Sequence, residues 1–147
     1  MKKTKKVKIG NILIGGGEKI AVQSMTTAYT ADVEKTVNQI NELERCGCDI
    51  VRIAVPDEKS AKAVYEIKKK TNVPIVADIH FDYRLALMCM ERGIDKIRIN
   101  PGNIGGEDRA RAVADEAKKR NVPIRIGVNG GSLEKELRAK YGGVTAE

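Results

Sequence analysis

The sequence predicts an α/β protein: a parallel β-sheet built from about five strand–helix units that follow an N-terminal β-hairpin. Short β-rich runs alternate with longer segments of helical periodicity along the 147 residues. The unit repeats roughly every 25 to 30 residues, and strands joined through a helix pair in parallel with right-handed crossovers. Two architectures satisfy this pattern, an open doubly wound sheet and a (βα)8 TIM-type barrel.

The first part of the chain predicts the hairpin. Val7–Ile14 and Lys19–Val22 are the expected strands, and Gly15-Gly16-Gly17 between them is typical of a turn. The lysine-rich residues before Val7 are expected to be a solvated basic tail. A hairpin in this place is compatible with a barrel whose floor it closes.

The strands and helices of the repeating units follow in alternation. Strands are expected at Ile20–Met25, Asp49–Val55, Pro74–Phe81, Asp95–Asn100 and Pro123–Asn129. Helices are expected at Asp32–Cys46, Asp57–Lys70, Tyr83–Arg92 and Glu107–Arg120, and a fifth is expected to begin near Ser132. Asp32 is a suitable N-cap for the first helix, and Gly47 is suited to end it.

The composition limits the possible partners. A formal charge of +7 admits an anionic partner, whether nucleic acid, a membrane surface or a phosphorylated small molecule. Only 3% of the residues are aromatic, which argues against stacking on nucleic-acid bases. No apolar run approaches the ~20 residues that span a bilayer, and we expect a cytoplasmic protein without nucleic-acid or membrane partners.

The cysteines do not predict a metal site within this chain. Cys46, Cys48 and Cys89 are an odd number without a regular framework, which argues against a disulfide scaffold. A structural metal site normally has four ligands at recognisable spacing. We expect three buried, unreactive thiols and no metal held by this chain.

Polar residues interrupt the predicted strands with a period of two. Parallel strands covered on both faces are normally continuous apolar runs. Here one face carries isoleucines and the other carries polar side chains, which are Arg52, Asp78, His80, Arg98, Asn100, Arg125 and Asn129. They lie toward the carboxyl ends of the strands, where barrel active sites are found. We therefore expect them to converge in a barrel interior or a crevice.

Three arginines with one carboxylate among them leave positive charge to be neutralised by a ligand. The planar guanidinium matches phosphate oxygens, so the pattern predicts a site for a diphosphate-sized anion. His80 is suited to donate to such a ligand, and Asp78 to orient an arginine. The alternative is an internal salt-bridge network. Pro101–Gly106, between a strand and a helix, is either a phosphate-cradling turn or an ordinary loop.

Four segments resemble, in order, the signatures of the 4-hydroxy-3-methylbut-2-enyl diphosphate synthase family. The similarity runs from about Val7 to the last residue, although Thr27–Ala31 departs from the usual pattern. The four segments are Val22–Thr26, Ala77–Asp82, Lys96–Asn103 and Arg125–Glu134.

The resemblance implies a fold and an activity. It implies that residues 1–147 are the N-terminal part of a substrate-binding TIM-type barrel domain, with the remaining strands and a C-terminal iron–sulfur domain outside this chain. In that family a [4Fe–4S] cluster, held by the second domain, reductively opens 2-C-methyl-D-erythritol 2,4-cyclodiphosphate with electrons from ferredoxin or flavodoxin. The residues that match the family's diphosphate grip are the polar residues above, and no catalytic residue is expected within this chain.

Other functions stay open at this point. One is a different barrel enzyme that acts on a phosphorylated or pterin-like substrate, because a fold does not fix its chemistry. A basic nucleic-acid-binding module is the other. Since five strands leave two open edges, we also expect the isolated chain to be inactive and to form a homo-oligomer or a rearranged sheet; the family forms a homodimer.

Overall fold

The computed structural model of the protein describes residues 4–132 and 135–143. Its centre is a five-stranded parallel sheet with the strand order β3-β4-β5-β6-β7. These strands are Gln23–Met25, Ile50–Ala54, Ile75–Asp78, Lys96–Ile99 and Ile124–Ile126. A separate antiparallel hairpin precedes them, formed by β1 (Val7–Ile9) and β2 (Ile12–Ile14).

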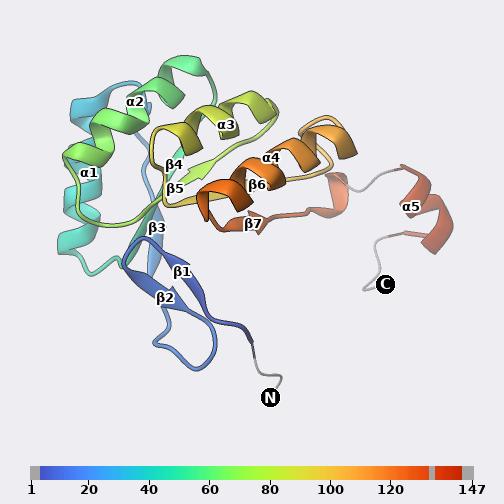
Figure 1. The fold of residues 1–147 in the computed structure, drawn as a ribbon, viewed down its shortest axis with the longest axis horizontal. Coiled ribbons are helices and arrows are strands. Elements are labelled where there is room, and N and C mark those ends of the chain that lie inside the picture. Colours follow the sequence, from blue (N-terminus) through green and yellow to red (C-terminus); the bar gives the residue numbers. More distant parts are fainter. Residues whose placement is uncertain (1–3, 133–134, 144–147) are drawn as a thin grey trace.

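The first four helices lie together on one side of the sheet (Figure 1). They are α1 (Val33–Arg45), α2 (Glu58–Lys69), α3 (Tyr83–Glu91) and α4 (Glu107–Arg120), followed by a short 3₁₀ turn (Gly130–Ser132) and α5 (Lys135–Tyr141). Each of the first four connects two neighbouring parallel strands. A doubly wound sheet reverses its strand order and has helices on both faces. The sequential order and one-sided helices are therefore those of part of a TIM-type barrel.

The main core fills the space between the sheet and its helices. From the sheet it receives the isoleucine face that period two predicts, including Val51, Ile53 and Ile97, all fully buried. The helices supply side chains such as Ile40 and Val64. The other face of the sheet is thereby left for the polar side chains.

The hairpin packs on that other face. Ile9 of β1 is fully buried and clusters with Ile50 of β4 and Val76 of β5. Its turn lies at the amino ends of the strands. Pro74 directly precedes β5, and a Cβ added to Gly10 would come within 2.9 Å of Pro74 Cγ. The hairpin thus closes the bottom of the sheet with apolar side chains.

The predicted hairpin turn was wrong. The two strands meet at Gly10 and Asn11, and Lys19–Val22 is not a strand. Gly15–Gly17 does form a turn, closed by the Glu18 amide donating to the Gly15 carbonyl, but it follows the hairpin. Gly10 has φ +55°, a conformation that glycine adopts without strain, so it is suited to the tight turn.

The prediction that all three thiols are buried was also wrong. Cys46 and Cys48 lie just after α1 and are exposed and half-buried respectively, whereas only Cys89 is buried in the core. Burial raises the pKa of the Cys89 thiol to about 12. In the described part of the chain, no three His, Cys, Asp or Glu side chains gather as a metal site, and no helix there has both the length and the apolarity to cross a bilayer.

Candidate functional site

The predicted polar residues share the face of the sheet opposite to the helices. The register pairs Asp78 with Arg98, and Arg98 with Arg125, at one level across β5, β6 and β7. Arg52 of β4 is paired with Val76, which lies two residues before Asp78 on β5, so Arg52 is closer to the hairpin. Because side chains alternate along a strand, all four point away from the helices.

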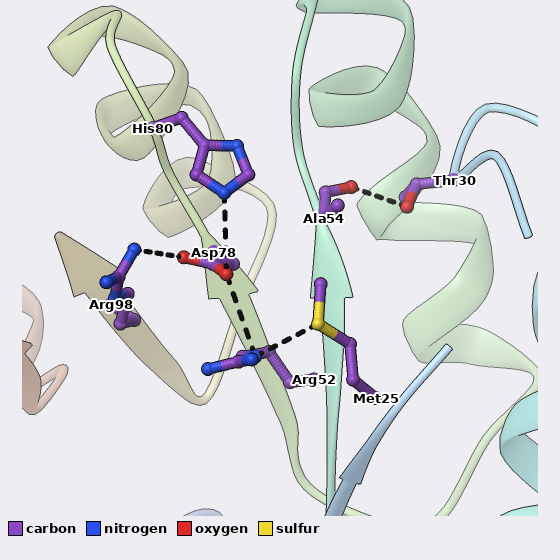
Figure 2. A network of polar contacts seen from close by, with 7 residues as sticks. All are labelled: Met25, Thr30, Arg52, Ala54, Asp78, His80 and Arg98. Carbon is purple, nitrogen blue, oxygen red and sulfur yellow. Dashed lines mark hydrogen bonds and ion pairs between the residues drawn. The ribbon is translucent and has the colours of Figure 1, made fainter. Parts of the chain in front are cut away.

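Asp78 is the centre of a polar cluster (Figure 2). Arg98 Nη1 donates to Asp78 Oδ1 at 3.0 Å, and Arg52 Nε lies 3.6 Å from Asp78 Oδ2. His80 Nε2 is also 3.6 Å from Oδ2. One carboxylate therefore contacts two guanidinium groups and an imidazole, which fixes their relative positions.

Burial differs across this cluster. The Asp78 side chain is 6% exposed, whereas those of Arg98, Arg52 and His80 are 17%, 27% and 43% exposed. The carboxylate is thus at the base, and the cationic side chains lead outward from it. A ligand that approaches from the open face meets the guanidinium and imidazole groups before it meets the carboxylate.

Besides Asp78, Met25 also contacts the guanidinium group of Arg52. The Arg52 Nε–H group donates to the Met25 sulfur at 3.2 Å, and Met25 is paired with Arg52 across β3 and β4. Met25 was not among the site residues predicted from the sequence. Met25 lies on the same face of the sheet as Arg52, its partner on β4. Period two, applied to apolar residues as well as polar ones, would therefore have selected it.

The three polar residues that follow strand ends are placed differently from the prediction. Asp78 is the last residue of β5, so His80 lies in the loop after it, and Asn100 and Asn129 likewise follow β6 and β7. The predicted strands were too long at these ends. Asn100 is 2% exposed, and its amide oxygen accepts a hydrogen bond from the Gly102 amide at 3.2 Å. Asn129 is exposed.

Arg125 does not join the ion pairs of Asp78. It is exposed on β7, the edge strand of the described sheet, and it forms no ion pair with any described residue. From the sequence, Arg125 was expected to converge with the other arginines. The register does place it beside Arg98, and the absence of a further described strand next to β7 leaves its side chain in solvent.

The loop at Pro101–Gly106 has the character of an ordinary connection between strand and helix. The amides of Gly102 and Asn103 are both used by Asn100, through its side chain and its carbonyl. Ile104 is fully buried and anchors the loop. The phosphate-cradle interpretation therefore has no support from these two amides.

Gly127 makes room for Arg98. A Cβ at position 127 would lie 2.7 Å from Arg98 Nε and 2.8 Å from Nη2, closer than nonbonded atoms approach. The Gly127 amide also donates to the Ile99 carbonyl at 2.9 Å. A side chain at this position would displace the guanidinium, so Gly127 is a site residue that the sequence analysis did not select. Gly127 lies two residues after Arg125, so period two places both on the same face of the strand.

The loop after β3 is fastened to the neighbouring strand end. The Thr30 hydroxyl donates to the Ala54 carbonyl at 2.5 Å (Figure 2). Gln39 of α1 accepts from the amides of Thr27 and Ala28 through its side-chain oxygen. The segment whose sequence departs from the family pattern is therefore a well-bonded loop at the carboxyl ends of the strands.

Known proteins of similar sequence cover nearly the whole chain. One relative, from Ruminiclostridium cellulolyticum, is named 4-hydroxy-3-methylbut-2-en-1-yl diphosphate synthase (flavodoxin). It is 61% identical over 144 residues, and the aligned region is 98% of this chain and 41% of the relative. The relative of the same name in Caldanaerobacter subterraneus subsp. tengcongensis is 63% identical over 146 residues, 99% of this chain and 41% of the relative. The chain thus spans about two fifths of the length of these curated relatives.

Solved structures of lower similarity support the fold. Dihydropteroate synthase from Stenotrophomonas maltophilia superposes with a TM-score of 0.63 at 16% identity, over 90% of this chain and 52% of that chain. The enzyme from Xanthomonas albilineans gives a TM-score of 0.59 at 15% identity, over 92% and 54% of the two chains. At this identity the likeness shows the fold alone.

The family comparison agrees with the one-sided helices and the sequential strand order. The GcpE TIM-barrel domain matches residues 4–147, which is nearly the entire sequence. With that match and the curated relatives at about 60% identity, this chain belongs to the GcpE TIM-barrel domain family.

Proposed function

We propose that this chain is the N-terminal, substrate-binding part of a 4-hydroxy-3-methylbut-2-enyl diphosphate synthase. That oxidoreductase of isoprenoid biosynthesis opens 2-C-methyl-D-erythritol 2,4-cyclodiphosphate reductively to 4-hydroxy-3-methylbut-2-enyl diphosphate. The cluster of Arg52, Arg98 and His80 around Asp78 carries the proposal, because it offers a diphosphate-sized anion several donors at the carboxyl ends of barrel strands.

The charges of the inner face favour an anionic ligand over an internal salt-bridge network. Asp78 is the one carboxylate in the cluster, and it faces Arg52 and Arg98, with Arg125 at the same level. One negative charge cannot neutralise three guanidinium groups. A diphosphate supplies the missing negative charge and accepts the bidentate hydrogen bonds that guanidinium groups form.

Each predicted residue has a role in this proposal. Arg52 and Arg98 grip the phosphate oxygens while Asp78 holds both guanidinium groups in place, and His80 donates a hydrogen bond or a proton from the outer side of the cluster. Arg125 completes the grip from β7, and Asn100 and Asn129 complete it from the loops after β6 and β7. No residue of this chain is assigned a catalytic role.

The redox chemistry of the proposed enzyme belongs to residues outside the described part of this chain. The cysteines here do not fit a [4Fe–4S] site, because Cys89 is buried in the core and Cys46 and Cys48 lie at the end of another helix. We propose that a C-terminal iron–sulfur domain of the full-length, cytoplasmic homodimer holds the cluster. Flavodoxin, named in the relatives, or ferredoxin supplies the electrons.

Calorimetric titration of the full-length protein with the cyclic diphosphate at physiological salt tests this proposal. We expect saturable binding that Arg98→Ala weakens by about tenfold to a hundredfold, since hydrogen bonds to charged groups contribute about 1.5–3 kcal/mol. Arg111→Ala is the matched control, because Arg111 is exposed on α4 and pairs with Glu107 of its own helix. Equal affinities of the two variants would refute the assignment, and binding of a pterin diphosphate instead would favour the other barrel activity.

A further inference from the structure

Lys96 is a buried cation on the same inner face as the arginines. It is the first residue of β6 and has the same parity as Arg98 and Asn100, and the register places it opposite Val76 of β5. Only 8% of its surface is exposed. Period two would have selected Lys96 from the sequence, but the sequence analysis did not include it.

No described residue neutralises this ammonium group. Lys96 forms no ion pair or side-chain hydrogen bond within residues 4–132 and 135–143. Asp78, the carboxylate on the next level of the neighbouring strand, is already shared by Arg52, Arg98 and His80. Burial lowers the pKa of Lys96, and the positive charge of Arg125 lowers it further.

The surroundings of Lys96 are apolar on one side and cationic on the other. Toward the hairpin lies the cluster that contains Ile9, Ile50 and Val76. Toward the carboxyl ends lie Arg98 and the Arg125 charge that acts on it. Burying an unpaired charge is costly, so the ammonium group requires a negative partner, and the open polar side is the direction from which one can arrive.

We propose that Lys96 is a further anion-binding residue that forms the floor of the site and contacts the innermost phosphate group of the ligand. The inference rests on the proposed diphosphate site and adds a cation at the level of Arg52, since Arg52 and Lys96 are both paired with Val76. Residues two apart on a strand are separated by about 6.6 Å. The flexible four-carbon stem of lysine is able to bring the ammonium group up toward the level of Arg98.

A point charge at the floor complements the arginine forks. Arg52 and Arg98 are held in orientation by Asp78, so their free donors point in fixed directions. An ammonium group has three rotatable donors and adapts to an oxygen that the forks do not reach. Among the described residues, Lys96 and Arg125 raise the number of cations on this face to four, against the single carboxylate of Asp78.

The test is the affinity of the full-length protein for pyrophosphate, measured by calorimetry for the wild type and for Lys96→Met. Methionine keeps the length of the side chain and removes the charge. We expect affinity to fall by about tenfold to a hundredfold. The unfolding temperature should not fall, because the substitution removes an unpaired buried charge. Lys62→Met is the matched control, since Lys62 is exposed on α2 and pairs with Glu58.

Unchanged affinity of Lys96→Met would overturn the inference. If the variant does not fold, a crystal structure of the wild-type protein with pyrophosphate decides. An Nζ atom within about 3.2 Å of a phosphate oxygen supports the proposal, and an Nζ atom paired with a protein carboxylate overturns it.

Arg98→Ala separates this inference from the proposed function. Loss of affinity in Arg98→Ala but not in Lys96→Met removes only the role of Lys96. No binding by the wild type, or full affinity in Arg98→Ala, removes the diphosphate site itself.

Discussion

At the scale of single residues, Asp78 organises the site. Its side chain is 6% exposed, and its carboxylate contacts Arg52 of β4, Arg98 of β6 and His80 in the loop after β5. A buried charge is tolerated when such partners surround it. The same contacts hold the two guanidinium groups in place before a ligand arrives, which lowers the entropy lost on binding.

Asp78→Asn is expected to lower the free energy of unfolding by about 3 kcal/mol, because it leaves two half-buried guanidinium groups without a counter-ion. Urea denaturation monitored by circular dichroism measures the change. Glu58→Gln is the control, as Glu58 forms an exposed pair with Lys62 on α2, and removing such a pair has little effect. A loss of stability no larger than that of the control would contradict the role of Asp78.

Gly127→Ala is expected to weaken diphosphate binding with little change in stability. The added Cβ lies 2.7 Å from Arg98 Nε, and the flexible guanidinium group moves away more easily than the backbone. Calorimetry with pyrophosphate and thermal unfolding give the two quantities. Gly131→Ala is the control, since an added Cβ there meets no atom within 4 Å; the same affinity in both variants would argue against positioning by Gly127.

At the scale of elements, capping residues fix where the helices begin and end. Asp32 and Asp57 accept hydrogen bonds from the amides of Lys35 and Ser60, at 3.2 and 2.8 Å, at the starts of α1 and α2. Gly47 ends α1 with φ +93°, and its amide and that of Cys48 donate to the carbonyls of Glu44 and Leu43. These short-range contacts explain why the boundaries of α1–α4 were predicted to within one residue, whereas α5 begins at Lys135 and not near Ser132.

Asp57→Ala is expected to destabilise the protein more than Asp32→Ala, because Asp57 also accepts a hydrogen bond from the Tyr29 hydroxyl at 2.6 Å. That hydrogen bond is the main reason why the pKa of Asp57 lies below its ordinary value of 3.8. The folded state therefore binds the proton less readily than the unfolded state does. The stabilising effect is present above the ordinary pKa and is lost as pH falls through the lowered one.

Urea denaturation at a series of pH values measures this effect. The difference in stability between the wild type and Asp57→Ala should stay constant near neutral pH and shrink below about pH 3.8. Asp115→Ala, at an exposed position within α4, should show no such dependence. A difference that persists unchanged into acid would mean that the Asp57 carboxylate is not the group responsible.

At the scale of the whole molecule, the sheet has two open edges. β3 and β7 each have one neighbour among the described strands. Ile126 on β7 and Val128 just after it are 64% and 53% exposed. Unpaired edge strands and exposed apolar side chains favour association with another chain. The strand order is sequential, so the sheet itself is not rearranged, and the predicted homo-oligomer stays a prediction.

The isolated chain of 147 residues is expected to self-associate in solution. Replacing Ile126 and Val128 together by lysine should shift it toward a monomer, because charges on an edge strand oppose pairing with another strand. Light scattering coupled to size-exclusion chromatography measures the mass. As a control, Tyr65→Lys changes an exposed side chain on α2 away from the edges. A monomeric wild-type chain would contradict the prediction.

The inner polar face was predictable because a strand has a strict period of two. Once Ile53 and Ile97 are assigned to the helix side, Arg52 and Arg98 must lie on the other side, and the register confirms it. The period of two no longer applies where the strands end. His80 and Asn129 lie in loops, whose direction depends on contacts with other segments and not on a local period.

The sequence by itself determined the alternation of strands and helices, the helix caps and the face on which each strand carries its polar residues, because these depend on neighbours within a few positions. Only the tertiary structure decided that Asp78 is shared by Arg52 and Arg98, that the hairpin turns at Gly10, and that Gly127 gives space to Arg98. The contacts of Asp78 and Gly127 join residues twenty or more positions apart, and the turn at Gly10 packs against Pro74, far along the chain. Their distances are set by the strand register and by the packing of the hairpin against the sheet.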